Sequence, residues 1–196
     1  MPGPTLIRFL QLLPQVSPEG NFLLKDLSGS GKRIDVLCRD LAACFEWAPM
    51  TWPKSGLELI AIIGDAKILK FKNPEDQTCK GEVGWATVVR NSLRGDPPSF
   101  IAVSNGILED VIHELNQPPV SALWVLDEKG SEISKVPDVH SAPQNSFMLG
   151  GHRGFDSQTI DIISKYKIRK ISLGRKSYLS SHCLAAIISE FERTVR

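Results

Sequence analysis

The sequence predicts an α/β protein with a mainly parallel sheet and helices on both of its faces. Dense aliphatic runs alternate along the chain with longer segments whose apolar residues recur at helical spacing. Strands that alternate with helices imply right-handed crossovers, which place helices over both faces of a parallel sheet. The chain has 196 residues, 42% of them hydrophobic and 23% charged, so we expect one domain with a buried core over residues 1–196.

The first half of the chain supplies strands, helices and the turns between them. The run 5–13 is apolar and is broken by Pro18 and Gly20, as a strand and its exit turn would be. Between residues 33 and 47 the apolar positions fall on one helical face, and Pro49 and Pro53 stop the pattern. We therefore expect strands at 5–13, 57–63 and 67–71, and helices at 33–47 and 85–93.

The second half repeats the alternation with shorter apolar runs. Residues 108–115 have helical spacing, and the last aliphatic run is followed by a long amphipathic segment. We expect strands at 100–103, 122–126, 147–149 and 168–173, and helices at 108–115 and 182–194.

Composition excludes several functional classes. The 23 Lys and Arg residues against 22 Asp and Glu residues give a formal net charge of +1, so a nucleic-acid surface would have to be a local patch. The four cysteines form no C-x-x-C pair and the four histidines have no metal-ligand spacing, so we expect no metal site and no disulfide framework. The run 6–13 is too short to span a bilayer. These observations favour a soluble cytoplasmic protein with no membrane partner.

Glycine-bearing loops after the apolar runs are the candidate ligand sites. In parallel sheets, ligands collect at the carboxyl ends of the strands, which here are followed by the loops 126–130, 149–155 and 172–183. Leu149-Gly150 and Leu173-Gly174 pass directly from a strand into glycine, so the backbone could approach a flat ligand such as adenine. The alternative is that these glycines only turn the chain.

The same loops carry a family resemblance. The runs FMLGGHRGF and ISLGRKSYLSSHCLAAI resemble the second and third knot loops of the SPOUT methyltransferases, and most closely the archaeal tRNA pseudouridine-54 N1-methyltransferase family (TrmY) and its bacterial relatives. The run FLLKDLSGSGKRIDVLCRDLAACF resembles the opening of that family. Residues 48–99 match poorly, and Gly151 stands where the family commonly has Asp, which puts the identity of the substrate in doubt.

The resemblance implies a fold, a cofactor and an assembly. It implies a deep trefoil knot within about residues 120–196, a bent S-adenosylmethionine held by the three loops, and a homodimer. The implied cofactor contacts are Leu126, Leu149, Gly150, Ser172, Leu173, Gly174, Arg175, Lys176, Ser177, Leu179 and Cys183.

The R-x-D element at the start of the first helix supplies the implied catalytic residues. By resemblance, Asp35 would accept the N1 proton of the target base or orient that base, and Arg33 would hold a phosphate or the base edge. The alternative is that Asp35 only stabilises the helix N-terminus by its charge and that Arg33 is solvated.

The implied substrate is tRNA, and its expected contacts are basic. Six basic residues and no acid lie between residues 165 and 176, although such a run can also be a solvated edge that discourages aggregation. The expected RNA contacts are Arg39, Arg153, Lys170, Arg175 and Lys176. Three other functions stay open: methylation of another uridine or pseudouridine in tRNA or rRNA, a non-catalytic module that binds the cofactor or RNA, and a flavodoxin-like domain with an unrelated ligand.

Overall fold

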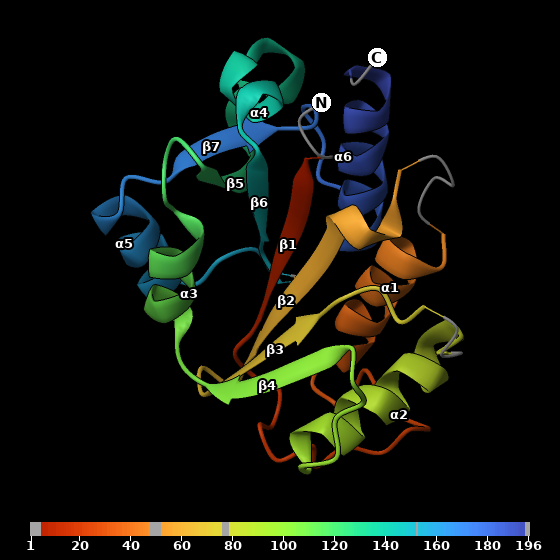
Figure 1. Ribbon diagram of the computed structural model, residues 1–196. Coiled ribbons are helices and arrows are strands. Elements are labelled where there is room, and N and C mark those ends of the chain that lie inside the picture. Colours follow the sequence, from red (N-terminus) through yellow and green to blue (C-terminus); the bar gives the residue numbers. More distant parts are fainter. Residues whose placement is uncertain (1–4, 48–51, 76–78, 152, 195–196) are drawn as a thin grey trace.

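The computed structural model describes residues 5–47, 52–75, 79–151 and 153–194, which form one seven-stranded sheet with helices on both sides (Figure 1). The strand order across the sheet is β4-β3-β2-β1-β6-β5-β7. The strands are β1 (Leu6–Leu13), β2 (Leu57–Ile63), β3 (Lys67–Phe71), β4 (Ile101–Asn105), β5 (Ser121–Glu132), β6 (Gln144–Leu149) and β7 (Arg169–Ser172).

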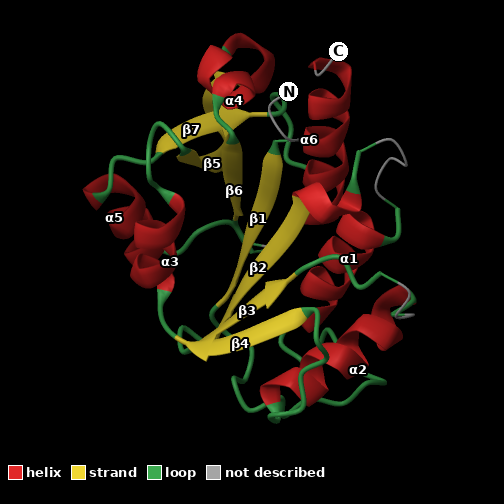
Figure 2. Cartoon of the chain, viewed as in Figure 1, coloured by secondary structure: helices red, strands yellow, loops and turns green. Residues whose placement is uncertain are grey.

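The helices lie in two layers, one on each face of the sheet (Figure 2). One layer holds α1 (Ile34–Phe45), α2 (Gly81–Leu93) and α6 (Ser180–Thr194), and the other holds α3 (Leu108–Leu115) and α5 (Ser157–Lys165). The short helix α4 (Pro137–Ser141) and the 3₁₀ turns Lys54–Gly56 and Ile133–Lys135 lie in connections. None of the described helices is both long enough and apolar enough to cross a membrane.

The pairing of the strands decides where the loops meet. β1 is parallel to β2 and β6, and β5 is parallel to β6 and β7, whereas β3 is antiparallel to β2 and β4. The prediction of a mainly parallel sheet is therefore confirmed. The carboxyl ends of β1, β6, β5 and β7 share one edge of the sheet, so their loops come together there.

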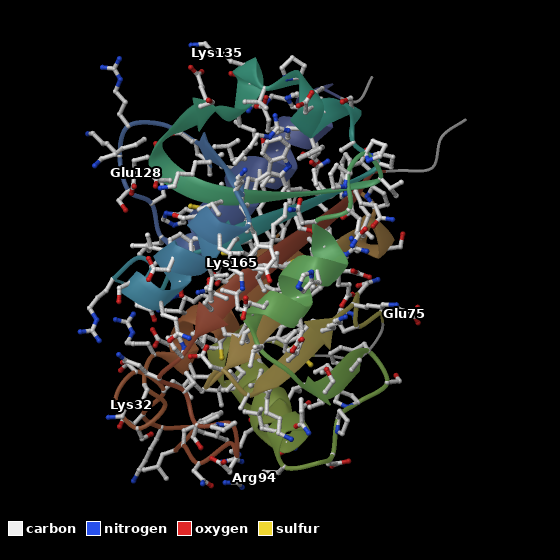
Figure 3. The ribbon with its side chains drawn as sticks, turned by 90° about the vertical axis from the view of Figure 1, so that its left-hand side faces the viewer. Lys32, Glu75, Arg94, Glu128, Lys135 and Lys165 are labelled. Carbon is white, nitrogen blue, oxygen red and sulfur yellow. The ribbon has the colours of Figure 1, made fainter. Side chains whose placement is uncertain are left out.

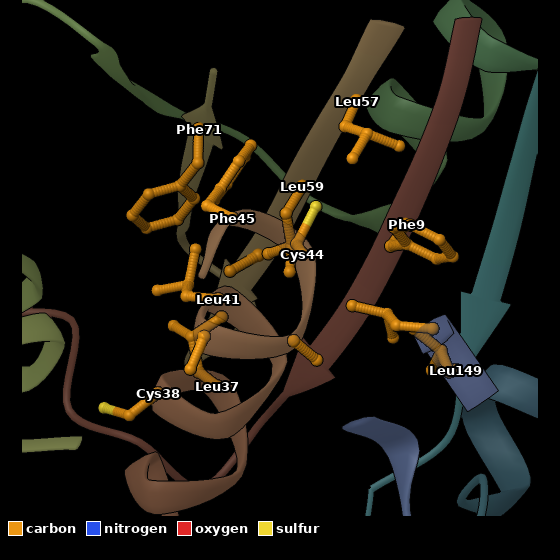
Figure 4. Packing of buried hydrophobic residues seen from close by; sticks show 14 of the residues in the cluster. Phe9, Leu37, Cys38, Leu41, Cys44, Phe45, Leu57, Leu59, Phe71 and Leu149 are labelled. Carbon is orange, nitrogen blue, oxygen red and sulfur yellow. The ribbon is translucent and has the colours of Figure 1, made fainter. Parts of the chain in front are cut away.

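Two apolar clusters fill the space between the sheet and its helices. Alternate residues of β1 point to opposite faces, so Phe9 and Leu13 join the cluster under α1 and α6 while Leu10 joins the cluster under α3 and α5. Leu37 and Leu41 of α1 are fully buried against the sheet, as Figure 4 shows. Each such leucine contributes about 1.5–3 kcal/mol of transfer free energy.

Helix α1 begins at a strained turn, and the residue that follows its last turn is hydrogen-bonded to helix α2. Lys32 and Arg33 have positive φ angles of 48° and 73°, which cost free energy in residues other than glycine. At the other end, the Glu46 carboxylate accepts hydrogen bonds from Gly81 N at 3.0 Å and from Trp85 Nε1 at 2.6 Å, so it caps α2.

Most predicted elements are confirmed, with bounds that shift by a few residues. The strand predicted at 122–126 is the largest correction: β5 runs on to Glu132, because after an irregularity Ser131 and Glu132 pair with β7 again. The helix predicted at 85–93 begins earlier, at Gly81. The helices α4 and α5 were not predicted from the sequence.

Candidate functional site

The three glycine-bearing segments predicted from the sequence meet at one cavity, although the first of them, 126–130, is part of strand β5 and not a loop. The cavity, which we call the donor cavity, has a volume of about 900 Å³ and lies where β6 and β7 end, against residues 125–129 within β5. This volume lies in the range of about 300–1,000 Å³ that is typical of cofactor sites. Nine of the predicted cofactor residues line it: Leu126, Leu149, Gly150, Leu173, Gly174, Lys176, Ser177, Leu179 and Cys183.

The other two predicted cofactor residues have different places. The Ser172 side chain is buried, and its hydroxyl donates to the Gly174 carbonyl at 2.8 Å and accepts from Gly174 N–H at 3.0 Å. This pair of bonds shapes the turn in which Gly174 has φ 146°, a value that L side chains rarely adopt. Arg175 is exposed and does not line the cavity in the described part of the chain.

The residues present fit an adenosyl cofactor. Leu126, Leu149 and Leu173 supply apolar wall, and Gly150 and Gly174 line the cavity beside them without a side chain. An apolar slot with a few backbone donors and acceptors is the arrangement that binds a flat heterocycle. The geometry therefore agrees with the cofactor predicted by resemblance.

An acid held by two arginines stands beside this cavity. The Asp35 carboxylate, 8% exposed, accepts hydrogen bonds from Arg33 Nε at 3.0 Å, from Arg33 Nη2 at 3.1 Å and from Arg39 Nη2 at 2.8 Å. Both arginines line the cavity. We call Arg33, Asp35 and Arg39 the acceptor cluster. Guanidinium groups therefore contact both carboxylate oxygens of Asp35.

A smaller cavity adjoins the first one at the acceptor cluster. Its volume is about 190 Å³, enough for one planar base, and it shares Arg33 and Phe155 with the larger cavity. Lys32 and Arg153 contribute two more cationic side chains to its wall. Figure 3 shows Lys32 on the same edge of the molecule as Glu128, which lines the larger cavity. The two cavities together offer room for a cofactor and a target base side by side.

Three of the six basic residues in the segment 165–176 form ion pairs with acids. Lys165 pairs with Glu109 at 2.7 Å, and Lys170 pairs with Asp127 at 2.7 Å, a hydrogen bond that lowers the pKa of Asp127. Arg169 pairs with Asp138 and lies over the Trp124 ring. Arg175 and Lys176 are exposed beside the cavity. Half of this basic segment is therefore neutralised by acids, and the RNA contacts at Lys170, Arg175 and Lys176 stay predictions.

A buried carboxyl group and a half-buried thiol lie near the cavity. Burial raises the pKa of Asp40 to about 8, although the hydrogen bond from Ser180 opposes this shift. Burial also raises the pKa of Cys183 to about 11, with Asp40 and Glu128 adding to it, so the thiol is a neutral wall of the cavity.

Asp40 was not singled out from the sequence, although a signal was there. It falls between Leu37 and Leu41 on the buried stripe of α1, where a carboxylate is out of place. His152, a histidine within a predicted cofactor loop, lies outside the described residues. Among the residues that are described, no group of three or more His, Cys, Asp or Glu side chains could hold a metal ion.

Comparison with known proteins agrees with this geometry. The fold is that of Archaeoglobus fulgidus Nep1, solved with S-adenosylhomocysteine bound: the two structures superimpose with a TM-score of 0.66 and 15% identity, covering 97% of this chain and 98% of that chain. Residues 8–194 match the family described as "Putative SAM-dependent RNA methyltransferase", and the chain belongs to this family.

Curated relatives are similar over most of their length. The chain is 31% identical over 186 residues to the tRNA (pseudouridine(54)-N(1))-methyltransferase of Thermococcus onnurineus, with 86% of this chain and 88% of that protein covered. It is 26% identical over 189 residues to the protein of the same name from Methanococcoides burtonii, covering 90% and 91%. The resemblance seen in the sequence is thereby confirmed.

Proposed function

We propose that this protein transfers the methyl group of S-adenosylmethionine to N1 of a pseudouridine in tRNA, at position 54. One observation carries the proposal: Arg33 and Arg39 of the acceptor cluster line the same cavity as the predicted cofactor residues. Relatives that carry this name are similar to the chain over 86% or more of its length in the two cases above.

The residues of the chain account for the acceptor side of the reaction. Bound S-adenosylmethionine supplies an electrophilic methyl group on its sulfonium. As the methyl–sulfur bond broke and left S-adenosylhomocysteine, N1 would gain the methyl carbon and give up its proton. Asp35 would receive that proton once Arg33 turned toward the RNA. Arg33 is 37% exposed at its side chain, so it can leave Asp35 for a phosphate or a base edge. Holding the base in line with the methyl group is the larger part of the task.

Threading of the chain, its assembly and its location are part of the same proposal. Ile171 of β7 pairs with both Leu126 and Ser131 of β5, so the residues between them pass around β7. Gly130 lies so close that a Cβ there would be 2.6 Å from the Ile171 carbonyl carbon. This arrangement supports a trefoil knot within about residues 120–196 of a single SPOUT domain. We further propose a cytoplasmic homodimer, for which light scattering of the purified protein is the test.

Methyl transfer to defined RNAs tests the proposal. Purified protein is incubated with labelled S-adenosylmethionine and two tRNA transcripts that differ only in uridine or pseudouridine at position 54, followed by nucleoside analysis. We expect 1-methylpseudouridine from the pseudouridine transcript alone. Methylation of total RNA at another uridine or pseudouridine would replace the proposed substrate. Binding of S-adenosylhomocysteine without transfer to any RNA would instead indicate a non-catalytic module.

A further inference from the structure

Asp40 is a buried carboxyl group with one oxygen bonded and one orphaned. Its side chain is fully buried on α1, and Oδ1 accepts a hydrogen bond from the Ser180 hydroxyl at 2.6 Å. Oδ2 is buried with no hydrogen-bond partner among the described residues. An apolar residue would avoid the free-energy cost of burying this group, so packing alone does not explain an aspartate here.

The partner of Asp40 stands at the end of the third cofactor loop. Ser180 is the first residue of α6, and it follows directly on Leu179, which lines the donor cavity as Ser180 itself does. The amides of His182 and Cys183 donate to the Leu179 carbonyl, so this first turn is continuous with the loop. A bond that fixes Ser180 therefore fixes the carboxyl-terminal end of the cavity wall.

The same helix that carries Asp40 also carries the acceptor cluster. Asp35 lies five residues earlier on α1, about 7.5 Å along the helix axis at the usual rise per residue. Arg39, the neighbour of Asp40 in sequence, is bonded to Asp35. Helix α1 thus carries the acceptor cluster near its start and, five residues further on, contacts the cavity wall at Ser180 through Asp40. A rigid helix between the two contacts sets their separation.

We propose that Asp40 is a positioning residue of the methyltransferase site, which holds the donor-binding wall at Ser180 in a fixed position relative to the acceptor cluster on α1. The role of the acceptor cluster in this inference rests on the proposed function. The contact of Asp40 with the cavity wall at Ser180 does not depend on it. A carboxyl group suits this task because a short hydrogen bond from a hydroxyl to a carboxyl oxygen fixes direction as well as distance, which apolar packing does not. Asp40 acts through Ser180 and touches neither substrate.

A double-mutant cycle on donor binding tests the inference. The variants are Asp40→Ala, Ser180→Ala and the two combined, and the measurement is the Kd for S-adenosylhomocysteine by calorimetry without RNA. We expect each single change to raise Kd about tenfold, and the double variant to bind no more weakly than the weaker single variant, because both changes remove one bond. Additive effects, or a Kd within twofold of wild type for Ser180→Ala, would overturn the proposal.

Two further variants separate positioning from general loss of structure. Asp40→Asn keeps an oxygen that can accept the Ser180 bond, so we expect Kd to stay within about threefold of wild type. If Asp40→Ala fails to fold, the Kd values of Asp40→Asn and Ser180→Ala are compared instead. The inference then requires a near wild-type Kd for Asp40→Asn and a raised Kd for Ser180→Ala. Ser92→Ala is the matched control, because it removes a buried hydroxyl that donates to Val88 O at 2.9 Å in α2, outside the cavity lining. An equal loss of affinity in Ser92→Ala would refute the inference.

The outcome is distinguishable from failure of the proposed function. Donor binding is measured without RNA, so a wrong tRNA substrate leaves the cycle unchanged. Conversely, correct methylation at position 54 together with additive effects in the cycle would leave the proposed function standing and remove the role of Asp40.

Discussion

Replacing Gly130 by alanine should destabilise the protein by about 3 kcal/mol. An added Cβ would lie 2.6 Å from the Ile171 carbonyl carbon, 2.7 Å from Ile171 N and 2.7 Å from the Lys170 carbonyl carbon. Carbon atoms normally approach to about 3.5–4.0 Å, so the two segments must separate by about 1 Å. Overpacking usually costs about 1–3 kcal/mol, and we place this change at the upper end because the obstacles are backbone atoms of β7.

Urea unfolding followed by circular dichroism measures this effect, and a second glycine supplies the control. Gly84 lies inside α2, where an added Cβ would be 3.7 Å from the Cys79 carbonyl carbon, an ordinary contact. Gly84→Ala should therefore stabilise the protein by up to about 1 kcal/mol through helix propensity. Identical unfolding midpoints for Gly130→Ala and the wild type would refute the close approach of β5 and β7.

Four other predictions concern single side chains. Asp35→Asn should lower the rate of methyl transfer to pseudouridine-containing tRNA by about 10²–10⁴-fold in single-turnover assays, because an amide cannot take up the proton; a rate within threefold of wild type would contradict its role as a base. Glu46→Ala should cost about 1–3 kcal/mol in urea unfolding, since the buried indole N–H of Trp85 loses its acceptor, whereas Glu46→Gln should recover most of it. The folded-state pKa of Asp40 is about 8 against an ordinary 3.8, so the contribution of this group to stability is complete below pH 4 and is lost as the pH rises to 8. The stability of Asp40→Asn relative to wild type should therefore increase over that range, and a constant difference would show that the carboxyl does not titrate. Cys183, with its pKa raised from 9.0 to about 11, should react with iodoacetamide at pH 8 about 100-fold more slowly than an ordinary thiol when followed by mass spectrometry; equal rates would contradict the raised pKa.

Elements with a strong local pattern could be predicted to the residue. The bounds of β2, β3 and α3 match their predicted ranges, because each is a dense or periodic apolar run between turn residues. Helix α5 was missed because it has few apolar positions and only Ile163 is buried. Its one clear local signal is Asp156, whose carboxylate accepts from Thr159 N at 2.8 Å as an N-cap.

The parts of the site that depend on distant contacts could not be read from local patterns. The resemblance located the cofactor loops and the Arg33-x-Asp35 element, and the structure brings nine of the predicted cofactor residues to one cavity. The bonds from Arg39 to Asp35 and from Ser180 to Asp40 depend on how α1 packs against its neighbours. The second pairing of β5 with β7 likewise joins segments some 40 residues apart, a separation at which propensity carries no information.

The donor cavity draws its walls from residues that are far apart in the order of translation. Arg33 and Val36 are translated well over 100 residues before Leu173 through Cys183. Contacts of such high sequence separation form late in folding. A nascent chain that ends at β6 lacks the cavity segments 150–155 and 172–183, so affinity for the donor reports that the chain has been synthesised and has folded through α6.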